Sequence, residues 1–275
     1  MKRDLPMLGA GLGFRTPYLS DLFLHREEVD FLEIIADHYF DATPEKEREL
    51  QLLADHFALV PHGLSLSLGS AEGLDRVYSQ KLVALVNRLA PPWWSEHLAF
   101  TRAGGVEIGH LTPLPYTWEA VEAVCKNIRE IAPQMNAPLL LENIAYTFTL
   151  PGAEITEAQF LTEIVERTDC GLLLDITNLY TNSVNHGFDI GAFLDAIPLE
   201  RVAQLHFVGG EWQDGTLIDT HSQATPDEVW ELMRVVLERA PVKGVLLERD
   251  ENLPAIEELL GELRKTRALW QEFRP

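Results

Sequence analysis

Four largely apolar runs in this chain each end in a residue that can bind a metal ion, and this repetition constrains the fold more than any other feature. The runs precede Glu142, Asp175, His206 and Glu248, and the clearest is Leu139–Leu141 before Glu142. A continuous apolar run is typical of a strand that is covered on both faces. Because burying an unpaired carboxylate costs several kcal/mol, the run ends predict a shared polar site.

Strand-like and helix-like segments alternate along the whole chain. We expect strands at residues 8–14, 29–35, 58–64, 93–98, 138–142, 172–175, 202–206 and 244–248. We expect helices at 16–26, 43–56, 74–89, 117–132, 156–167, 189–196, 225–240 and 253–270. The stretches 101–115 and 209–215 are expected to be loops, and 177–185 to be irregular or briefly helical.

This alternation indicates parallel strands joined by right-handed crossovers. Eight units in 275 residues predict a single (β/α)₈ TIM barrel over residues 1–275, with a doubly wound open sheet as the alternative. Polar residues at the carboxyl end of nearly every strand favour the barrel, because those ends converge on one mouth.

Charge and composition exclude several classes of function. The net charge of −21, from 22 Lys and Arg against 43 Asp and Glu, argues against binding a nucleic-acid backbone. We find no apolar run of membrane-spanning length and no secretory signal. Cys125 and Cys170 lack a CxxC partner, and we interpret both as reduced packing residues of a cytoplasmic protein.

The predicted mouth gathers many potential ligands. In chain order they are Asp37, His38, His62, His97, Glu142, Asn143, Asp175, Asn178, His186, His206, Asp219, His221 and Glu248. Imidazoles with carboxylates suit Fe, Mn, Zn or Co, and the lack of cysteine ligands argues against a structural zinc site. The set exceeds one coordination sphere, so we predict two or three metal ions, with Glu142 bridging two of them.

Each of these residues also has an ordinary interpretation. A single histidine at a strand end is more often a hydrogen-bonded core residue, and Asp219 could organise a turn. Six acids and bases on buried strand ends are harder to explain that way: His62, His97, Glu142, Asp175, His206 and Glu248. We expect His25, His56 and His110 to be surface histidines.

Eight short motifs in a fixed order resemble the multinuclear non-haem iron-dependent oxidases (MNIO). They are Gly11-Leu12-Gly13-Phe14-Arg15, Pro61-His62-Gly63-Leu64-Ser65-Leu66-Ser67, Ser95-Glu96-His97-Leu98, Leu141-Glu142-Asn143, Leu174-Asp175-Ile176-Thr177-Asn178, Asn185-His186-Gly187-Phe188-Asp189, Leu205-His206 and Ile218-Asp219-Thr220-His221. Each motif is short, but together they span nearly the whole chain.

The resemblance implies a xylose-isomerase-type TIM barrel that holds two or three irons, in mixed Fe(II)/Fe(III) states, and uses O₂ as co-substrate. It implies His62, His97, Glu142, Asp175, His206 and Glu248 as main ligands, with Asn178, His186, Asp219 and His221 near a third metal. Glu142, Asp175 and His206 would be the catalytic set. The substrate would be a ribosomally made precursor peptide modified at Cys, Asp or Asn, commonly delivered by a separate recruiting protein.

Two positions depart from the family pattern. Many relatives have Glu-Asn where this chain has Asp37-His38, and many have Trp where it has Arg249. We expect Asp37, His38, Asn143 and Arg249 to contribute to substrate binding. An arginine at the mouth would suit a substrate carboxylate, although an ion pair with Asp250 or Glu251 is an equal alternative.

Other functions are compatible with the same barrel. A metal-dependent hydrolase, an abasic-site endonuclease with three zinc ions and a sugar isomerase are the nearest. The acidic charge disfavours the nuclease, and no clear catalytic lysine supports the isomerase. A non-catalytic barrel that binds peptide or metal is the remaining alternative.

Overall fold

The computed structural model describes residues 4–273, in which eight parallel strands form a closed barrel. Around the barrel the order is β1 (Gly9–Gly13), β12 (Gly244–Leu247), β9 (Val202–Phe207), β8 (Gly171–Asp175), β7 (Leu139–Glu142), β4 (Trp94–His97), β3 (Ala58–Gly63) and β2 (Phe31–Ile35). All eight pairs of neighbouring barrel strands are parallel. The predicted (β/α)₈ barrel is therefore confirmed, and the open sheet is excluded.

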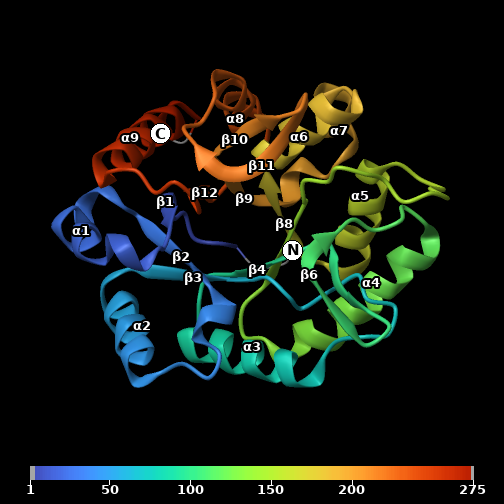
Figure 1. The fold of residues 1–275 in the computed structure, drawn as a ribbon, viewed down its shortest axis with the longest axis horizontal. Helices are drawn as coiled ribbons and strands as arrows, with labels where there is room; N and C mark the ends of the chain where they lie inside the picture. The colour runs from blue at the N-terminus through green and yellow to red at the C-terminus, as the bar shows by residue number, and fades with distance from the viewer. Residues whose placement is uncertain (1–3, 274–275) are drawn as a thin grey trace.

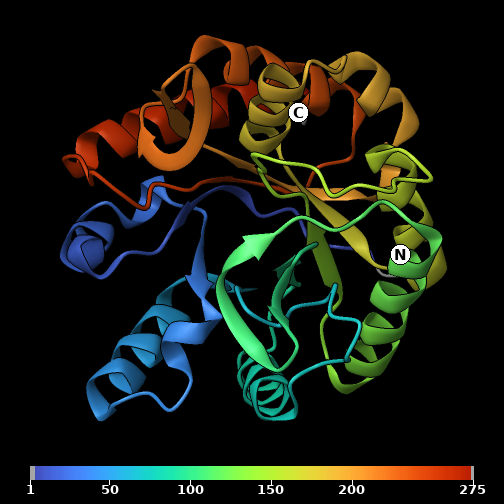
Figure 2. The same ribbon diagram turned by 45° about the vertical axis from the view of Figure 1, so that its right-hand side comes forward.

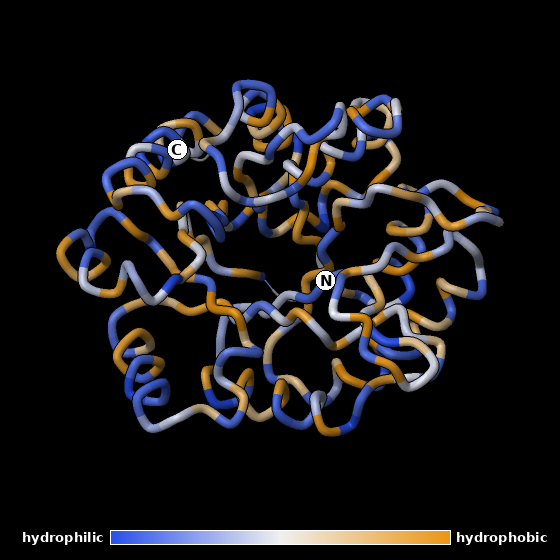
Figure 3. Tube along the Cα trace, viewed as in Figure 1, coloured by the Kyte–Doolittle hydropathy of each residue, from blue (hydrophilic) through white to orange (hydrophobic). Residues whose placement is uncertain are grey.

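Helices surround the strands as an outer ring (Figure 1). They are α1 (Leu19–Leu24), α2 (Pro44–His56), α3 (Arg76–Leu89), α4 (Trp118–Ile131), α5 (Glu157–Thr168), α6 (Ile176–His186), α7 (Ile190–Ala196), α8 (Asp227–Arg239) and α9 (Ile256–Phe273). Hydrophilic and hydrophobic stretches alternate along this ring, as expected of helices with one buried face (Figure 3). None of the helices between residues 4 and 273 is long and apolar enough to cross a membrane.

Side-chain caps begin several of these helices. The hydroxyl of Thr43 accepts a hydrogen bond from the backbone of Lys46 at the start of α2. Thr156 and Gln159 form a complete capping box at the start of α5. These caps satisfy backbone N–H groups that would otherwise lack partners. Because capping favours particular residue types, the starts of these helices can be predicted from the sequence.

Three segments differ from expectation. The predicted loop 101–115 contains an antiparallel hairpin, β5 (Phe100–Ala103) and β6 (Val106–Thr112), and the predicted loop 209–215 lies in a second one, β10 (Gly209–Gln213) and β11 (Thr216–Gln223). Residues 177–185, expected to be irregular or briefly helical, lie in the regular helix α6. Figure 2 shows the green β5–β6 hairpin apart from the barrel strands.

On six of the strands, the inward-facing side chains change from apolar to polar within two residues. An apolar cluster fills one layer, which we call the floor: Leu5, Phe31, Val60, Trp93, Leu140, Leu173, Ala203 and Leu246. Two residues later on six of these strands stand buried polar groups, the mouth layer: Glu33, His62, Ser95, Glu142, Asp175 and Glu248. Because alternate strand residues face the same side, both layers point into the barrel.

Gly11 shows why a glycine is needed on β1. A Cβ atom there would lie 2.5 Å from the Phe31 ring, which is closer than side chains tolerate. The missing side chain gives Phe31 room to fill the floor. The glycine-rich strand is therefore explained by packing.

Candidate metal centre

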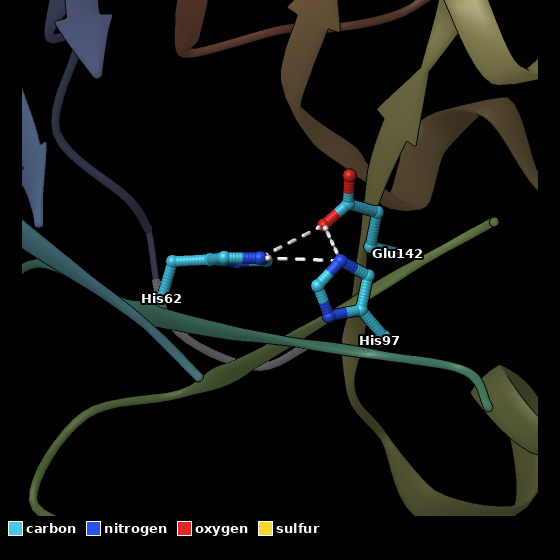
Figure 4. A group of neighbouring side chains, drawn as sticks. All are labelled: His62, His97 and Glu142. Atoms are coloured by element: carbon cyan, nitrogen blue, oxygen red, sulfur yellow. Dashed lines mark hydrogen bonds and ion pairs between the residues drawn. The ribbon is translucent and has the colours of Figure 1, made fainter. Parts of the chain in front are cut away.

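His62 and Glu142 of the mouth layer, on β3 and β7, converge with His97 at the end of β4 (Figure 4). Nε2 of His62 lies 3.4 Å from Nε2 of His97 and 3.4 Å from Oε2 of Glu142. Nε2 of His97 lies 3.5 Å from the same carboxylate oxygen. Donor atoms about 2.1 Å from a tetrahedral ion lie about 3.4 Å apart, so this triangle fits one face of such a coordination sphere.

Glu142 also belongs to a second group, with Asp175, His206 and Glu248. Nδ1 of His206 lies 2.9 Å from Oε2 of Glu248 and 3.3 Å from Oε1 of Glu142. The two oxygens of Glu142 therefore face different groups. This is the geometry that a carboxylate needs to bridge two metal ions.

Several donor atoms in this region are buried without a hydrogen-bond partner among residues 4–273. They are Oε2 of Glu142, Oδ2 of Asp175, Nδ1 of His206, Oδ1 of Asn178 and Oδ1 of Asp219. Buried polar atoms are nearly always satisfied, so such a concentration indicates a missing ligand. The residues present fit a cation.

The electrostatics of the cluster point the same way. Burial raises the pKa of Asp175, and the nearby charges of Asp219 and Glu142 raise it further. Burial alone would lower the pKa of His97, but Glu142 and Glu96 hold it up at about 9. The clustered carboxylates therefore draw protons onto imidazoles, and a bound cation would take the place of those protons.

Asp175 connects the centre to helix α6. One carboxylate oxygen caps the helix by accepting a 2.7 Å hydrogen bond from the backbone of Asn178, while Oδ2 is left free. The Asn178 side chain donates to the carbonyl of Asn143, which leaves its own Oδ1 free as well. Asp219 lies 3.0 Å from His221 on β11. Asn178, Asp219 and His221 thus lie beside the two groups, where a third ion was expected.

A cavity of about 240 Å³ opens over the centre. Part of its polar lining comes from the cluster: His97, Glu142, Asn178, Asp219 and His221. Its apolar lining comes from the two hairpins and the loop after β7: Leu111, Pro113, Ile144, Phe148, Leu217 and Ile218. The site is therefore polar where the ligands lie and apolar along its walls, as in many ligand pockets.

Helix α6 holds both walls of the cavity in place. The Asn182 amide accepts a hydrogen bond from the backbone of Tyr146 and donates one to the carbonyl of Ile144. Asn185 pairs in the same two-way manner with Leu217 on β11. These amides replace backbone partners that the loop and the hairpin lack.

Several expected site residues have other contacts. The Asn143 amide pairs in both directions with the backbone of Asp175, so it extends the ladder between β7 and β8. His186 is exposed, stacks on the Tyr146 ring and contacts the Tyr146 carbonyl, away from the ligand groups found among the described residues. Both contacts are structural, and neither residue lines the cavity.

Asp37, His38 and Arg249 lie at the edge of the predicted constellation. Asp37 accepts hydrogen bonds from the Leu64 backbone and the Tyr78 hydroxyl, and His38 is exposed. Arg249 is buried and contacts the Glu262 side chain and the Ser222 carbonyl. These contacts match neither expected role, which were a substrate-binding group at the mouth and an ion pair with Asp250 or Glu251. Because Glu248 points into the barrel, its neighbour Arg249 points outward toward α9.

Four residues near the centre were not anticipated. Glu33 and Glu96 are buried carboxylates that contact His206 and His97. Asp250 forms a further group with His221 and Glu248. His110 is exposed, as expected of a surface histidine, and it also lines the cavity from β6. Strand alternation could have identified Glu33, because it follows Phe31 on the same face.

Comparison with known proteins identifies the relatives of this chain. The family described as RiPP precursor modification enzyme MbnB/TglH/ChrH matches residues 9–271. A UPF0276 protein of Caulobacter vibrioides (strain NA1000 / CB15N) is 39% identical over 270 residues, covering 98% of this chain and 96% of the relative. A UPF0276 protein of Vibrio vulnificus (strain YJ016) is 37% identical, covering 94% of this chain and 90% of the relative.

The fold has solved counterparts. D-psicose 3-epimerase from Clostridium cellulolyticum H10 superposes with a TM-score of 0.59 at 14% identity, covering 98% of both chains. At this identity the likeness concerns the barrel alone. The match over residues 9–271, together with the full-length relatives, shows that this chain belongs to the family of RiPP precursor modification enzymes MbnB/TglH/ChrH.

Proposed function

We propose that this protein is a multinuclear non-haem iron-dependent oxidase that uses O₂ to modify a Cys, Asp or Asn residue of a ribosomally made precursor peptide. The observation that carries the proposal is the position of Glu142, whose two carboxylate oxygens face two separate groups of ligands. A carboxylate in that position can hold two ions close together. Membership of a peptide-modifying family supplies the substrate class.

The ligand types support iron. Both groups contain only imidazole and carboxylate donors, and the two cysteines are buried elsewhere as free thiols. This donor set suits redox-active iron, as it suits Mn, Zn or Co, and it contains no thiolate of the kind found in structural zinc sites. Iron bound there would supply O₂ activation and oxidation of the substrate.

The residues of the chain would divide the work. His62, His97 and Glu142 would hold one ion, and Glu142, Asp175, His206 and Glu248 a second. Asn178, Asp219 and His221 would bind a third ion or a substrate group, because each contributes a polar atom to the cavity. The apolar walls would exclude water and orient the peptide, which is how a protein confines such chemistry.

The remaining features of the proposal concern delivery and location. We propose a cytoplasmic enzyme that receives its precursor peptide from a separate recruiting protein. Phe148 lines the cavity and is 51% exposed, and its aromatic ring would contact a bound peptide side chain.

The decisive experiment combines metal analysis with turnover. Protein purified without oxygen should contain two or three irons per chain, give Mössbauer signals of Fe(II) and Fe(III), and consume O₂ only with its peptide. A short Cys- or Asp-rich reading frame beside the gene would supply that peptide. Stoichiometric zinc without iron, together with no O₂ uptake, would refute the proposal.

Two rivals are separated by simple controls. Under anaerobic conditions a sugar isomerase would interconvert a ketose and an aldose, and an epimerase would interconvert two ketoses, whereas an oxidase would do neither. If the protein is a non-catalytic barrel, the wild type and Glu142→Gln should bind the peptide equally well, and neither should form product. The proposal expects wild type to form product and the variant to bind peptide without turnover.

A further inference from the structure

His206 is enclosed by carboxylates on both edges of its ring. Nδ1 faces Glu248 and Glu142 at 2.9 and 3.3 Å. Nε2, on the other edge, lies 3.0 Å from the carboxylate of Glu33. The imidazole has no solvent exposure, so these groups decide which nitrogen carries a proton.

Glu33 is itself held by a buried chain of polar groups. The indole N–H of Trp93, in the floor, donates to Oε1 of Gln204. This contact orients the Gln204 amide so that its NH₂ group donates to Oε2 of Glu33 at 2.7 Å. The Glu33 carboxylate therefore has a fixed position, and it is 4% exposed.

The chain of contacts allows two tautomers of the neutral His206 imidazole, the form in which a histidine binds a metal ion. If Nε2 carries a proton, it donates to Glu33 and leaves Nδ1 free for a metal ion. If Nε2 is bare, the Gln204 NH₂ group 2.9 Å away would donate to it, and Nδ1 would carry the proton instead. A carboxylate is the stronger partner for an N–H donor, so the contact with Glu33 favours the first arrangement.

We propose that Glu33 is a positioning residue that keeps the proton of His206 on Nε2 and so presents Nδ1 to the metal shared by Glu142, Asp175 and Glu248. The inference rests on the proposed function in requiring a metal ion there, but not on which reaction follows. Glu33 lies on the Nε2 edge of the ring, opposite the ligand group, and therefore acts through His206. Carboxylates behind histidine ligands commonly fix the ring and strengthen its binding.

The other histidines provide an internal comparison. Nδ1 of His62 is backed by the neutral hydroxyl of Ser95 at 2.8 Å. Nδ1 of His97 has only a distant carboxylate, Glu96, at 3.7 Å. His206 alone among these three has a carboxylate within hydrogen-bonding distance of the nitrogen that faces away from its ligand group. Loss of Glu33 should therefore weaken one metal position and spare the one formed by His62 and His97.

The test uses Zn(II) as a redox-silent probe on the full chain. Zinc affinity is measured by competition with a chromophoric chelator in wild type, Glu33→Ala, Glu33→Gln and Glu157→Gln. We expect Glu33→Ala to weaken one of the zinc positions by about 10–100-fold. We expect Glu33→Gln, which keeps a neutral acceptor, to weaken it about fivefold. Glu157→Gln removes a partly buried carboxylate outside the ligand groups and should bind zinc as wild type does.

Proton positions give a second readout that does not depend on activity. Long-range ¹H–¹⁵N spectra of the zinc-loaded wild type should show the His206 ring proton on Nε2. In Glu33→Ala this proton should exchange with solvent faster. A proton on Nδ1, or unchanged zinc affinity in Glu33→Ala, would overturn the inference. If Glu33→Ala does not fold, judged by circular dichroism of the metal-free chain, unchanged affinity in Glu33→Gln overturns it equally.

The two proposals fail separately. Zinc binding that depends on Glu33, in a protein whose iron form consumes no O₂ with its peptide, would uphold the positioning role and refute the oxidase. Iron-dependent turnover, together with zinc binding that does not change when Glu33 is substituted, would uphold the oxidase and refute the positioning role.

Discussion

The floor and the mouth layer of this barrel occupy the same strands and the same inner face, yet they have opposite chemistry. On β7 the floor residue is Leu140, and Glu142 follows two positions later. On β8 the pair is Leu173 and Asp175. The backbone is equivalent in both layers, so only the side chain distinguishes a residue that packs from one that can bind metal.

The comparison shows how the cost of a buried polar site is contained. The floor excludes water and closes one end of the barrel with Trp93 and Phe31, both fully buried. The carboxylates of the mouth layer then lie on an apolar base, where a bound cation interacts with them more strongly than in water. Stability should therefore depend on the floor, and metal binding on the mouth layer. Three predictions test that division, and a fourth concerns a carboxylate outside both layers.

The largest effect is expected from Glu142→Gln. The variant loses the carboxylate that both ligand groups share, so it should retain less than one metal ion per chain. Turnover should fall by at least about 10³-fold, because metal assistance supplies several kcal/mol of transition-state stabilisation. Metal analysis and product formation measure both. Wild-type metal content in this variant would contradict the division of roles.

Metal removal should produce the next largest effect. Two ions, each present at a hundredfold excess over its dissociation constant, would stabilise the fold by about 5 kcal/mol in total. A chelator should therefore lower the melting temperature of the wild type by about 10–20 °C. Glu142→Gln serves as the control and should melt at nearly the same temperature with and without chelator. An unchanged wild-type melting curve would argue against metal in the mouth layer.

Leu140→Ala tests the floor on the same strand. Removing this buried side chain should cost about 2–5 kcal/mol of unfolding free energy, because it leaves a cavity beneath the centre. Urea unfolding of the metal-free protein measures the loss. The folded variant should still bind the wild-type number of ions. A loss of metal without a loss of stability would contradict the assignment of stability to the floor and of metal binding to the mouth layer.

Glu157 tests a partly buried carboxylate that belongs to neither layer. It begins α5 and accepts a hydrogen bond from the Tyr146 hydroxyl at 2.8 Å, and burial raises its pKa from 4.5 to about 7. The folded state thus favours the protonated acid. Its contribution to stability is full below pH 4.5 and is lost as the pH rises to about 7, by at most about 3 kcal/mol.

The measurement is a difference between two proteins. Unfolding free energies of wild type and Glu157→Gln are compared from pH 5 to pH 8 in the presence of chelator. The variant should gain stability relative to wild type as the pH rises through this window. A constant difference would show that the carboxylate is already ionised in the folded protein.

Prediction from sequence succeeded for features that follow from the residue pattern along a single strand. Alternation along a strand and the polar ends of apolar runs were enough to indicate a barrel and to assemble its six main candidate ligands at one mouth. The structure brings together His62, His97, Glu142, Asp175, His206 and Glu248 in two overlapping groups. Their binding of iron remains a prediction.

Prediction was weaker where contacts between elements decide. Helix α6 is rich in Thr, Asn and Ser, which have low helix propensity, so it was expected to be irregular. Its amides instead hold the loop after β7 and the second hairpin, and these contacts stabilise a helix that propensity disfavours. His186, at the end of this helix, contacts Tyr146 for the same reason: the partner comes from another part of the chain.

By itself, the sequence determined the eightfold alternation, the apolar floor and the row of ligands above it, because these follow from the two-residue period of a strand. Only the tertiary structure decided that Glu142 faces two groups at once, that Glu33 lies behind His206 and that Arg249 turns outward to Glu262. Those relations join residues up to 173 positions apart. They depend on the barrel closing, which brings β2 and β9 to the same mouth.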